Sequence, residues 1–237
     1  MSHDTRMQAV RQKQECFDQF CGAWLSEYRQ RGGSIYCGKG CSGCCRLVVN
    51  CTANEAIAVA RVVTPEQQVR LQAAIPVIAK CAQQAGSLKD WLKSYRDQAG
   101  PCPFLEQDGS CGVYQQRPLS CRSLLSTREP HWCTADFGAL SHEQKQQFME
   151  QLDRSVVAFP THYAATPQEL AQELELAHLR EMEQDYGCSL LGNLPWLVWL
   201  TLEHRLDELL MSGGAAVRSY MAEHGLDSPY LSVVSGD

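Results

Sequence analysis

The 237-residue sequence has no excess of positive charge and no long apolar run. Lys and Arg number 21 against 27 Asp and Glu, which gives a net charge of −6 and a pI near 5.7. Proteins that bind nucleic acid draw affinity from neutralising phosphates, so we expect no nucleic-acid partner. The most apolar stretch, residues 191–204, is interrupted by Pro195 and falls short of the ~18–20 residues that span a bilayer. The first residues of the sequence are polar and charged and do not resemble an apolar signal peptide. We therefore expect a cytoplasmic protein without a membrane partner.

Several catalytic signatures are also missing. The seven histidines are scattered without a His-Glu-x-x-His motif, and no Ser-His-Asp triad can be inferred. The string Gly38-x-Gly40-x-x-Gly43 has the letters of a dinucleotide-binding fingerprint, but it follows no predicted strand and contains Cys41. We therefore assign it to no nucleotide, and the sequence leaves the catalytic residues unknown.

Cysteine, in contrast, is abundant. The chain has 13 cysteines, an odd number that argues against a fully paired disulfide framework. In a reducing compartment, clustered thiols are more often metal ligands or catalytic groups than disulfides.

The predicted fold class is mainly α: a helical domain that encloses two irregular, Cys-rich metal-binding loops and a short β-hairpin. Capping boxes predict helix starts at Thr52, Thr64 and Ser141, and Asp108-Gly109 predicts the hairpin turn. Pro76 is expected to kink or divide the helix that begins at Pro65. The other expected helices cover residues 4–31, 53–63, 87–98, 142–157, 167–186, 195–211 and 215–224.

Two parts of the chain are distinguished by composition. Residues 1–135 form a predicted cysteine-cluster metal-binding domain with an N-terminal helix. Residues 136–237 form a predicted helical C-terminal extension, packed on the first part as one globular unit.

Eight cysteines concentrate in the two irregular segments, where core cysteines rarely gather. Irregular backbone lacks ladder hydrogen bonds, and a bound metal offsets the entropy of ordering it. Cys-x2-Cys and Cys-x3-Cys turns bring two sulfurs to one side of the chain. The predicted metal ligands are Cys37, Cys41, Cys44, Cys45, Cys102, Cys111, Cys121 and Cys133.

The neighbouring pair Cys44-Cys45 limits how these thiols can be shared. Side chains of adjacent residues diverge, so both sulfurs rarely bind one tetrahedral ion. Two metals, or one polynuclear cluster with a spare thiol beside it, fit the pair better. The remaining cysteines are interpreted as small buried hydrophobes: Cys16, Cys21, Cys51, Cys81 and Cys188.

Several polar residues beside the thiols are expected to surround the metal without binding it. Cations compensate the charge of bound thiolates, and an imidazole can ligate or donate a hydrogen bond. This expected outer set is Lys39, Arg46, Tyr114, Arg117, Arg122 and His131.

The order of these motifs resembles a known family. Cys-x3-Cys-x2-Cys-Cys at 37–45 is followed by Cys102-Pro-Phe-Leu, Cys111-x-Val-Tyr and Arg117-Pro-x-x-Cys121-Arg. This pattern is similar to the YkgJ-type cysteine-cluster proteins, over about residues 35–125. The resemblance implies a zinc- or iron-chelating domain. A distantly similar group, the flagellin lysine N-methylases, is linked to an iron–sulfur cluster and S-adenosylmethionine.

Zinc and iron–sulfur both remain open, because thiolates suit both. We favour an iron–sulfur cluster, in particular [4Fe–4S], over zinc. The reasons are that all candidate ligands are thiols and that a run of three cysteines is followed by a distant fourth. The spacing Cys37-x3-Cys41-x2-Cys44 also occurs in radical S-adenosylmethionine enzymes, but those need a barrel that this helical pattern does not predict. The leading interpretation is a protein with one or two iron–sulfur clusters and a redox or protein/peptide-modifying role, with a protein or peptide partner. The alternatives are a zinc-stabilised interaction module without catalysis and S-adenosylmethionine-dependent methyl transfer.

Overall fold

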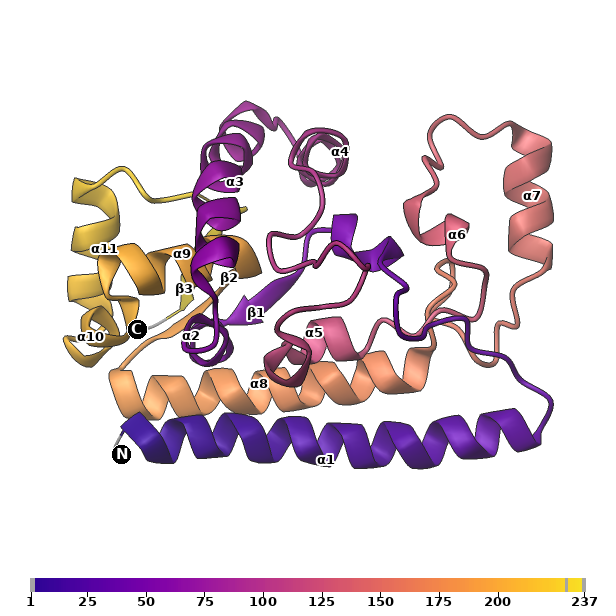
Figure 1. Ribbon diagram of the computed structural model, residues 1–237, viewed down its shortest axis with the longest axis horizontal. Coiled ribbons are helices and arrows are strands. Elements are labelled where there is room, and N and C mark those ends of the chain that lie inside the picture. The colour runs from indigo at the N-terminus through magenta and orange to yellow at the C-terminus, as the bar shows by residue number, and fades with distance from the viewer. Residues whose placement is uncertain (1–2, 229, 236–237) are drawn as a thin grey trace.

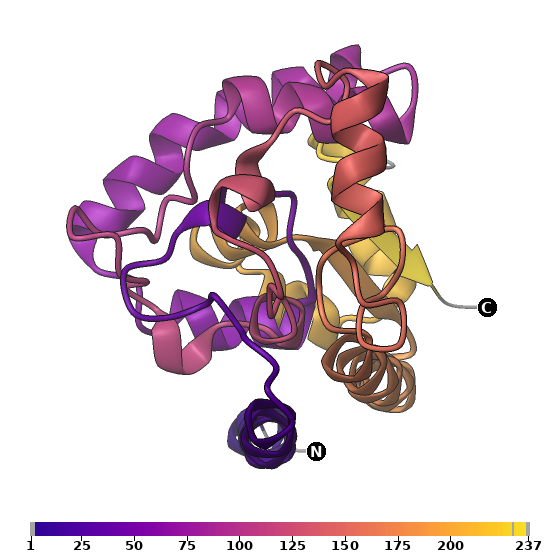
Figure 2. The same ribbon diagram turned by 90° about the vertical axis from the view of Figure 1, so that its right-hand side faces the viewer.

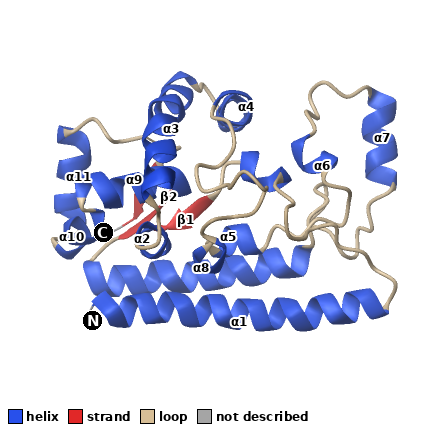
Figure 3. Cartoon of the chain, in the orientation of Figure 1, coloured by secondary structure: helices blue, strands red, loops and turns tan. Residues whose placement is uncertain are grey.

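The computed structural model describes residues 3–228 and 230–235, and it confirms a mainly α fold (Figure 1, Figure 3). Two long helices, α1 (His3–Gln30) and α8 (Ala165–Tyr186), run antiparallel along one side of the molecule. Ion pairs join them, from Arg6 to Asp185 at 3.1 Å and from Lys13 to Glu181 at 2.6 Å. Figure 2 shows α1 end-on beneath the irregular loops, so this helix borders the region that carries the cysteines.

The main apolar core lies among the other helices. Ile57, Leu71, Ile78 and Leu197 are buried within it. Helix α9 packs on both α2 and α3. The helices of this region are α2 (Ala53–Ala60), α3 (Pro65–Gln84), α4 (Leu88–Gln98), α9 (Leu194–His204), α10 (Leu206–Met211) and α11 (Gly214–Glu223). Within the described residues, no helix is both long and apolar enough to cross a membrane.

The predicted helix starts are largely confirmed. Thr52, Thr64 and Ser141 each accept a hydrogen bond from the third helical residue in a complete capping box. Ser87 caps α4 in the same way without the reciprocal bond. Helix α8 begins at Ala165, two residues before the predicted start, and its N-cap Ala164 makes no side-chain hydrogen bond.

Two predicted helices were too long. Helix α7 (His142–Glu150) ends well before residue 157, because the Asp153 carboxylate accepts the Ser155 N–H at 3.0 Å and forms a turn instead. The expected helix over 195–211 is divided at Arg205, whose φ of 52° is left-handed. The change of direction buries Leu206 completely. Pro76 stands inside α3 without dividing it.

A small sheet was not predicted. It has three antiparallel strands in the order β1 (Asn50–Thr52), β2 (Ser189–Asn193) and β3 (Ser232–Ser235). Cys51 pairs with Gly192, which ties the segment after the first cysteine cluster to the C-terminal half.

The cysteine-bearing segments contain only short elements. The expected hairpin at Asp108-Gly109 is present as a tight turn with a single bridge, between Leu105 and Cys111. The other elements are η1 (Gly43–Arg46), η2 (Tyr114–Gln116), α5 (Leu119–Arg122) and α6 (His131–Thr134). The division of the chain at residues 135 and 136 stays a prediction.

Candidate metal centre

The fold brings the two cysteine-rich segments together. The N–H of Cys102 donates to the carbonyl oxygen of Cys45 at 2.8 Å, and the N–H of Tyr36 donates to the carbonyl oxygen of Ser126 at 2.9 Å. A further contact lies at Gly109, where an added Cβ would stand 3.0 Å from the carbonyl oxygen of Gly40. Gly109 also has a φ of 79°, so the turn needs a glycine for both reasons.

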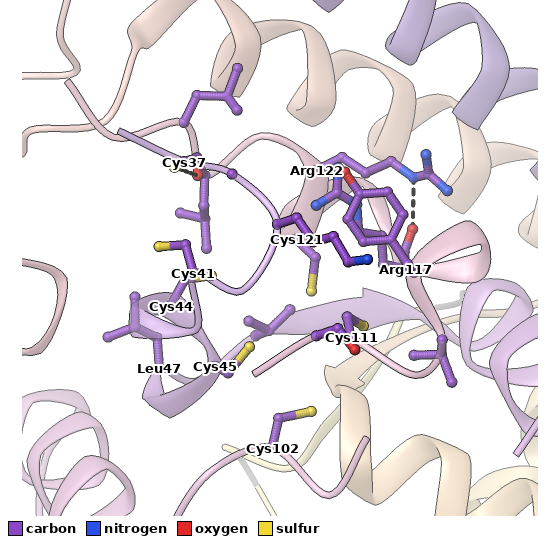
Figure 4. A pocket seen from close by; sticks show the side chains of 18 of the residues that line it. Cys37, Cys41, Cys44, Cys45, Leu47, Cys102, Cys111, Arg117, Cys121 and Arg122 are labelled. Carbon is purple, nitrogen blue, oxygen red and sulfur yellow. Dashed lines mark hydrogen bonds between the residues drawn. The ribbon is translucent and has the colours of Figure 1, made fainter. Parts of the chain in front are cut away.

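A cavity of about 780 Å³ lies between these segments and α1 (Figure 4). Its apolar lining residues include Phe17 and Leu25 of α1 and, from the second cysteine-rich segment, Phe104 and Val113. Seven of the eight predicted ligands line it: Cys37, Cys41, Cys44, Cys45, Cys102, Cys111 and Cys121. Cys133 is not among the lining residues.

The first group of thiols gathers around one end of the cavity. Figure 4 shows Cys45, Cys102, Cys111 and Cys121 arranged around a common space. Cys102 and Cys111 both lie close enough to raise the pKa of the Cys121 thiol electrostatically, after burial itself. We call these four residues the all-thiol group.

The second group lies toward α6. Cys41 and Cys133 both raise the pKa of the Cys37 thiol, and Cys44 adds to the effect on Cys37 and on Cys133. An added Cβ on Gly43 would stand 2.9 Å from the Cβ of Cys133, so η1 and α6 are in close contact. We call Cys37, Cys41 and Cys133 the α6-side group.

Cys44 stands between the two groups. Its strongest interaction is with the Cys45 side chain, and it is also an electrostatic neighbour of Cys102, Cys111 and Cys121. Both members of the adjacent pair therefore lie beside Cys102, Cys111 and Cys121, with Cys44 also next to the α6-side group.

Burial keeps the thiols protonated when no cation balances them. It raises the pKa of Cys37 to about 11 and that of Cys102 to about 12, and it raises the pKa of Cys111, Cys121 and Cys133 as well. A metal binds thiolate, so metal binding at this site must release protons.

Arg117 is the cation closest in effect to the thiols. Burial raises the pKa of Cys111 and of Cys121, and the positive charge of Arg117 opposes both rises. Its guanidinium stacks 4.1 Å from the ring centroid of Tyr114, and its buried Nε has no hydrogen-bond partner among the described residues. Both side chains line the cavity.

The other residues predicted to surround the metal differ in whether they line the cavity. Lys39 lines the cavity, whereas Arg46 and His131 are exposed and do not. Arg122 also lines the cavity, but its buried guanidinium is held by Asp18 and by the carbonyl oxygens of Arg117 and Gln115. Arg122 therefore ties α1 to the loop that carries the thiols. The assigned metal roles of these residues stay predictions.

The five cysteines interpreted as core residues divide. Cys21, Cys51, Cys81 and Cys188 are buried, as expected. Cys16 is exposed, and its assignment to the core was wrong. The two α1 cysteines point to different sides of the helix, so only Cys21 faces the cavity.

A buried carboxylate, Glu55, holds the start of the short helix that carries Cys121. One oxygen of Glu55 accepts the backbone N–H of Leu119 at 2.8 Å, and the other accepts the N–H and hydroxyl of Thr52, each at 3.0 Å. Leu119 opens the short helix that carries Cys121. Burial raises the pKa of the Glu55 carboxyl, and these hydrogen bonds oppose the rise. The sequence presented Glu55 only as part of a capping box.

The sequence also gave no reason to select His162 and Tyr163. His162 Nε2 lies 3.4 Å from Cys133 Sγ, and both residues are buried. Burial, with the nearby Arg128 cation, lowers the pKa of His162 to about 4, so the imidazole is neutral at neutral pH. The contact joins residues far apart in sequence, so no motif spacing could have found it.

The donor set fits a soft or borderline metal, although the donors are not closely gathered. Thiols with one imidazole are the ligands that zinc and iron–sulfur clusters select. Among the described residues, no three His, Cys, Asp or Glu side chains converge closely enough to hold an ion. A single-ion site on these thiols therefore requires the loops to close.

Comparison with protein families agrees with this chemistry. Residues 36–151 match the CxxCxxCC family model, described as a "putative zinc- or iron-chelating domain". This segment is a CxxCxxCC domain. Comparison with curated proteins and with solved structures gives no match.

The CxxCxxCC domain contains all eight predicted ligands, so the recognition of a metal-binding cysteine cluster is confirmed. Several contributors to the site lie outside it, among them Leu194 and Pro195, which line the cavity. Helix α1 precedes the domain and forms a wall of the cavity, and His162 follows it.

Proposed function

We propose that this protein holds an iron–sulfur cluster on the all-thiol group, with a redox or protein/peptide-modifying role. The observation that carries the proposal is the arrangement of Cys45, Cys102, Cys111 and Cys121 around one end of a cavity. Cys45 and the other three come from segments far apart in sequence, joined by the hydrogen bond from Cys102 to Cys45. Four thiolates on a shared cluster are the usual ligand set of [4Fe–4S] centres.

The surroundings favour a cluster over a single zinc ion. The cavity is far larger than one ion needs, and Phe104 and Val113 give it apolar walls that limit contact with water. Cys44 and Cys45 both lie beside the other three thiols, so one of the pair can bind a cluster while the other remains a neighbouring thiol. Solvent exclusion and nearby hydrogen bonds are the protein's means of setting a cluster's potential.

The modifying role is supported by two cations that line the same cavity. Arg29 and Arg117 are among its lining residues, and neither forms a salt bridge with a described residue. Two cations without carboxylate partners beside an apolar wall suit an anionic group of a peptide or small-molecule partner. S-adenosylmethionine-dependent methyl transfer is one reaction of this kind, and a saturable spectral shift on titrating that cofactor would support it.

Anaerobic purification with elemental analysis tests the proposal. We expect a brown protein with broad visible absorption and stoichiometric iron and acid-labile sulfide. Cys121→Ser should lose most of the iron and the colour. Cys81→Ser is the control, because Cys81 is buried in the apolar core and does not line the cavity.

A colourless protein that contains only zinc would eliminate the iron–sulfur reading and favour the interaction module. Loss of iron in Cys81→Ser to the same extent as in Cys121→Ser would show that the iron content reports folding and not ligation.

A further inference from the structure

A second kind of donor lies beside the α6-side group. Cys133 and His162 are 8% and 5% exposed, and Sγ of the first is 3.4 Å from Nε2 of the second. A tetrahedral ion with bonds of about 2.3 Å to sulfur and about 2.0–2.1 Å to nitrogen separates those two atoms by about 3.6 Å. The pair thus already stands at the separation that two ligands of one ion require.

The imidazole is held in place by backbone pairing. Residues 125–127 run beside residues 162–164, with a bridge between Ser126 and Tyr163 and a 2.9 Å hydrogen bond from the Ala164 N–H to the Leu125 carbonyl oxygen. The carbonyl oxygen of His162 accepts the Thr127 N–H at 3.0 Å. The ring of His162 also packs edge-on to Phe148. The main chain of His162 is thus fixed by the pairing, and its ring is held by Phe148 and by the contact with Cys133.

The same backbone pairing places a second thiol nearby. The N–H of Ser126 donates to Cys37 Sγ at 3.2 Å, and the side chain of Ser126 interacts with the Cys133 thiol. Cys41 is an electrostatic neighbour of both Cys37 and Cys133. Three thiols and one imidazole are therefore neighbours, although no three of them converge closely enough in the described residues to hold an ion.

An unpartnered hydroxyl faces this region as well. Tyr163 is 8% exposed, its hydroxyl is directed at the Cys133 thiol, and it has no hydrogen-bond partner of acceptable geometry among the described residues. A buried hydroxyl without a partner is unfavourable, and a thiolate is a far better acceptor than a thiol. Conversion of Cys133 to a metal-bound thiolate would satisfy it.

We infer that His162 is the nitrogen ligand of a second, mixed site, in which Cys37, Cys41 and Cys133 supply three thiolates to one divalent ion of the zinc class. The inference rests on the proposed metal-binding function, but it adds a centre that differs from the all-thiol group in its ligands. Tyr163 donates to the Cys133 thiolate. Binding of the ion draws Cys37 and Cys41 toward the preset pair of Cys133 and His162. His131, the histidine nearest to Cys133 in sequence, takes no part.

Cadmium-113 is a suitable probe, because Cd²⁺ binds thiolates and its nucleus couples to ligand nitrogens. The metal-free full-length protein, labelled with ¹⁵N-histidine, is titrated with ¹¹³Cd²⁺ alone. We expect one cadmium resonance with a one-bond coupling to a single histidine nitrogen. The coupling should vanish in His162→Gln and persist in His131→Gln and in the exposed control His142→Gln.

Affinity separates ligation from packing. His162→Gln should weaken the binding of one equivalent of cadmium. The loss of affinity should exceed the roughly 10–100-fold that follows from removing a residue that only hydrogen-bonds to a ligand. His162→Cys should restore tight binding without the nitrogen coupling, because it replaces one donor by another.

Three results would overturn the inference while leaving metal binding intact: cadmium resonances without any histidine coupling, a coupling that His131→Gln removes, or failure of His162→Cys to restore affinity lost in a folded His162→Gln. Absence of cadmium binding in the wild-type protein would instead refute metal binding as a whole.

Discussion

Cys102 donates its backbone N–H to the carbonyl oxygen of Cys45 at 2.8 Å. This bond links the last cysteine of the first cluster to the first cysteine of the second. Neither residue lies in a long helix, so the position of each sulfur depends on the other segment. Damage to one segment should therefore reach the metal ligands of the other.

The contact between η1 and α6 gives a first prediction. In Gly43→Ala the new methyl would stand 2.9 Å from Cβ of Cys133 and 3.1 Å from the carbonyl oxygen of Pro130. The two elements must move apart, at a cost of about 1–3 kcal/mol. We expect lower metal content by mass spectrometry of the metal and a lower midpoint of urea unfolding.

Gly38→Ala is the control in the same loop, because an added Cβ there meets nothing within 4 Å. Its unfolding free energy should stay within about 0.5 kcal/mol of the wild type. Equal metal loss in both variants would contradict a specific role for the Gly43 contact.

The carboxylate of Glu55 gives a second prediction. Glu55→Gln keeps the shape, but its NH₂ must face a donor, either the N–H of Leu119 or that of Thr52. One buried N–H then lacks an acceptor, which costs about 1–3 kcal/mol. Urea unfolding should show this loss, and Glu66→Gln, an exposed carboxylate in the first turn of α3, should show almost none. Equal stability of the two variants would remove Glu55 as a support of the Cys121 helix.

Helix α8 carries a carboxyl group whose burial predicts a pH dependence. Burial raises the pKa of Glu175 to about 7, and the nearby Glu55 carboxylate adds to the rise. The Cys51 thiol is a further titratable group near Glu175. Because the folded protein holds this proton more tightly than the unfolded chain does, the buried carboxyl does not destabilise the fold below about pH 4.5. The free energy of unfolding then decreases as the pH rises from about 4.5 to 7.

Glu175→Gln should therefore be more stable than the wild type at pH 8, by up to about 3 kcal/mol, and nearly equal to it at pH 4. His178 resists protonation in both proteins, so its opposite trend cancels in the difference. The exposed Glu173→Gln is the control on the same helix. A stability difference that does not change with pH would contradict a raised pKa.

Removal of the metal should loosen the cysteine-rich segments and leave the main core intact. Ile57, Leu71 and Leu197 are buried in an apolar core, against which Cys102, Cys111 and Cys121 pack only as partly buried residues. After treatment with a chelator, we expect faster hydrogen exchange over residues 36–46 and 102–133, and unchanged protection in α2, α3 and α9. Loss of protection everywhere would mean that the whole fold depends on the metal.

The parts of the fold that local chemistry determines were predictable. The pairs of Thr52 with Glu55 and Thr64 with Gln67 set helix starts through contacts three residues apart. The sheet was not predictable in this way, because β1 and β2 pair across most of the chain and β2 lacks an alternating pattern. The left-handed Arg205 is likewise a consequence of packing and not of its own preference.

The same division applies to the site. The clustering of cysteines in irregular segments predicted a metal-binding domain, and this is confirmed. The sorting of Cys44 and Cys45 and the approach of His162 to Cys133 depend on tertiary contacts. Arg122 illustrates the converse, because its place beside Cys121 in sequence predicted charge compensation, whereas its guanidinium is engaged by Asp18 of α1.

Helix α1 lies outside the CxxCxxCC domain, yet Phe17 is buried against Leu119 and Ala171 while the same helix closes one side of the cavity. If the proposed cluster is present, this helix sets how far the cluster is exposed to solvent on that side, and solvent exposure is one determinant of a cluster's reduction potential. Removing the Phe17 ring in Phe17→Ala should therefore shift the potential of the reconstituted full-length protein.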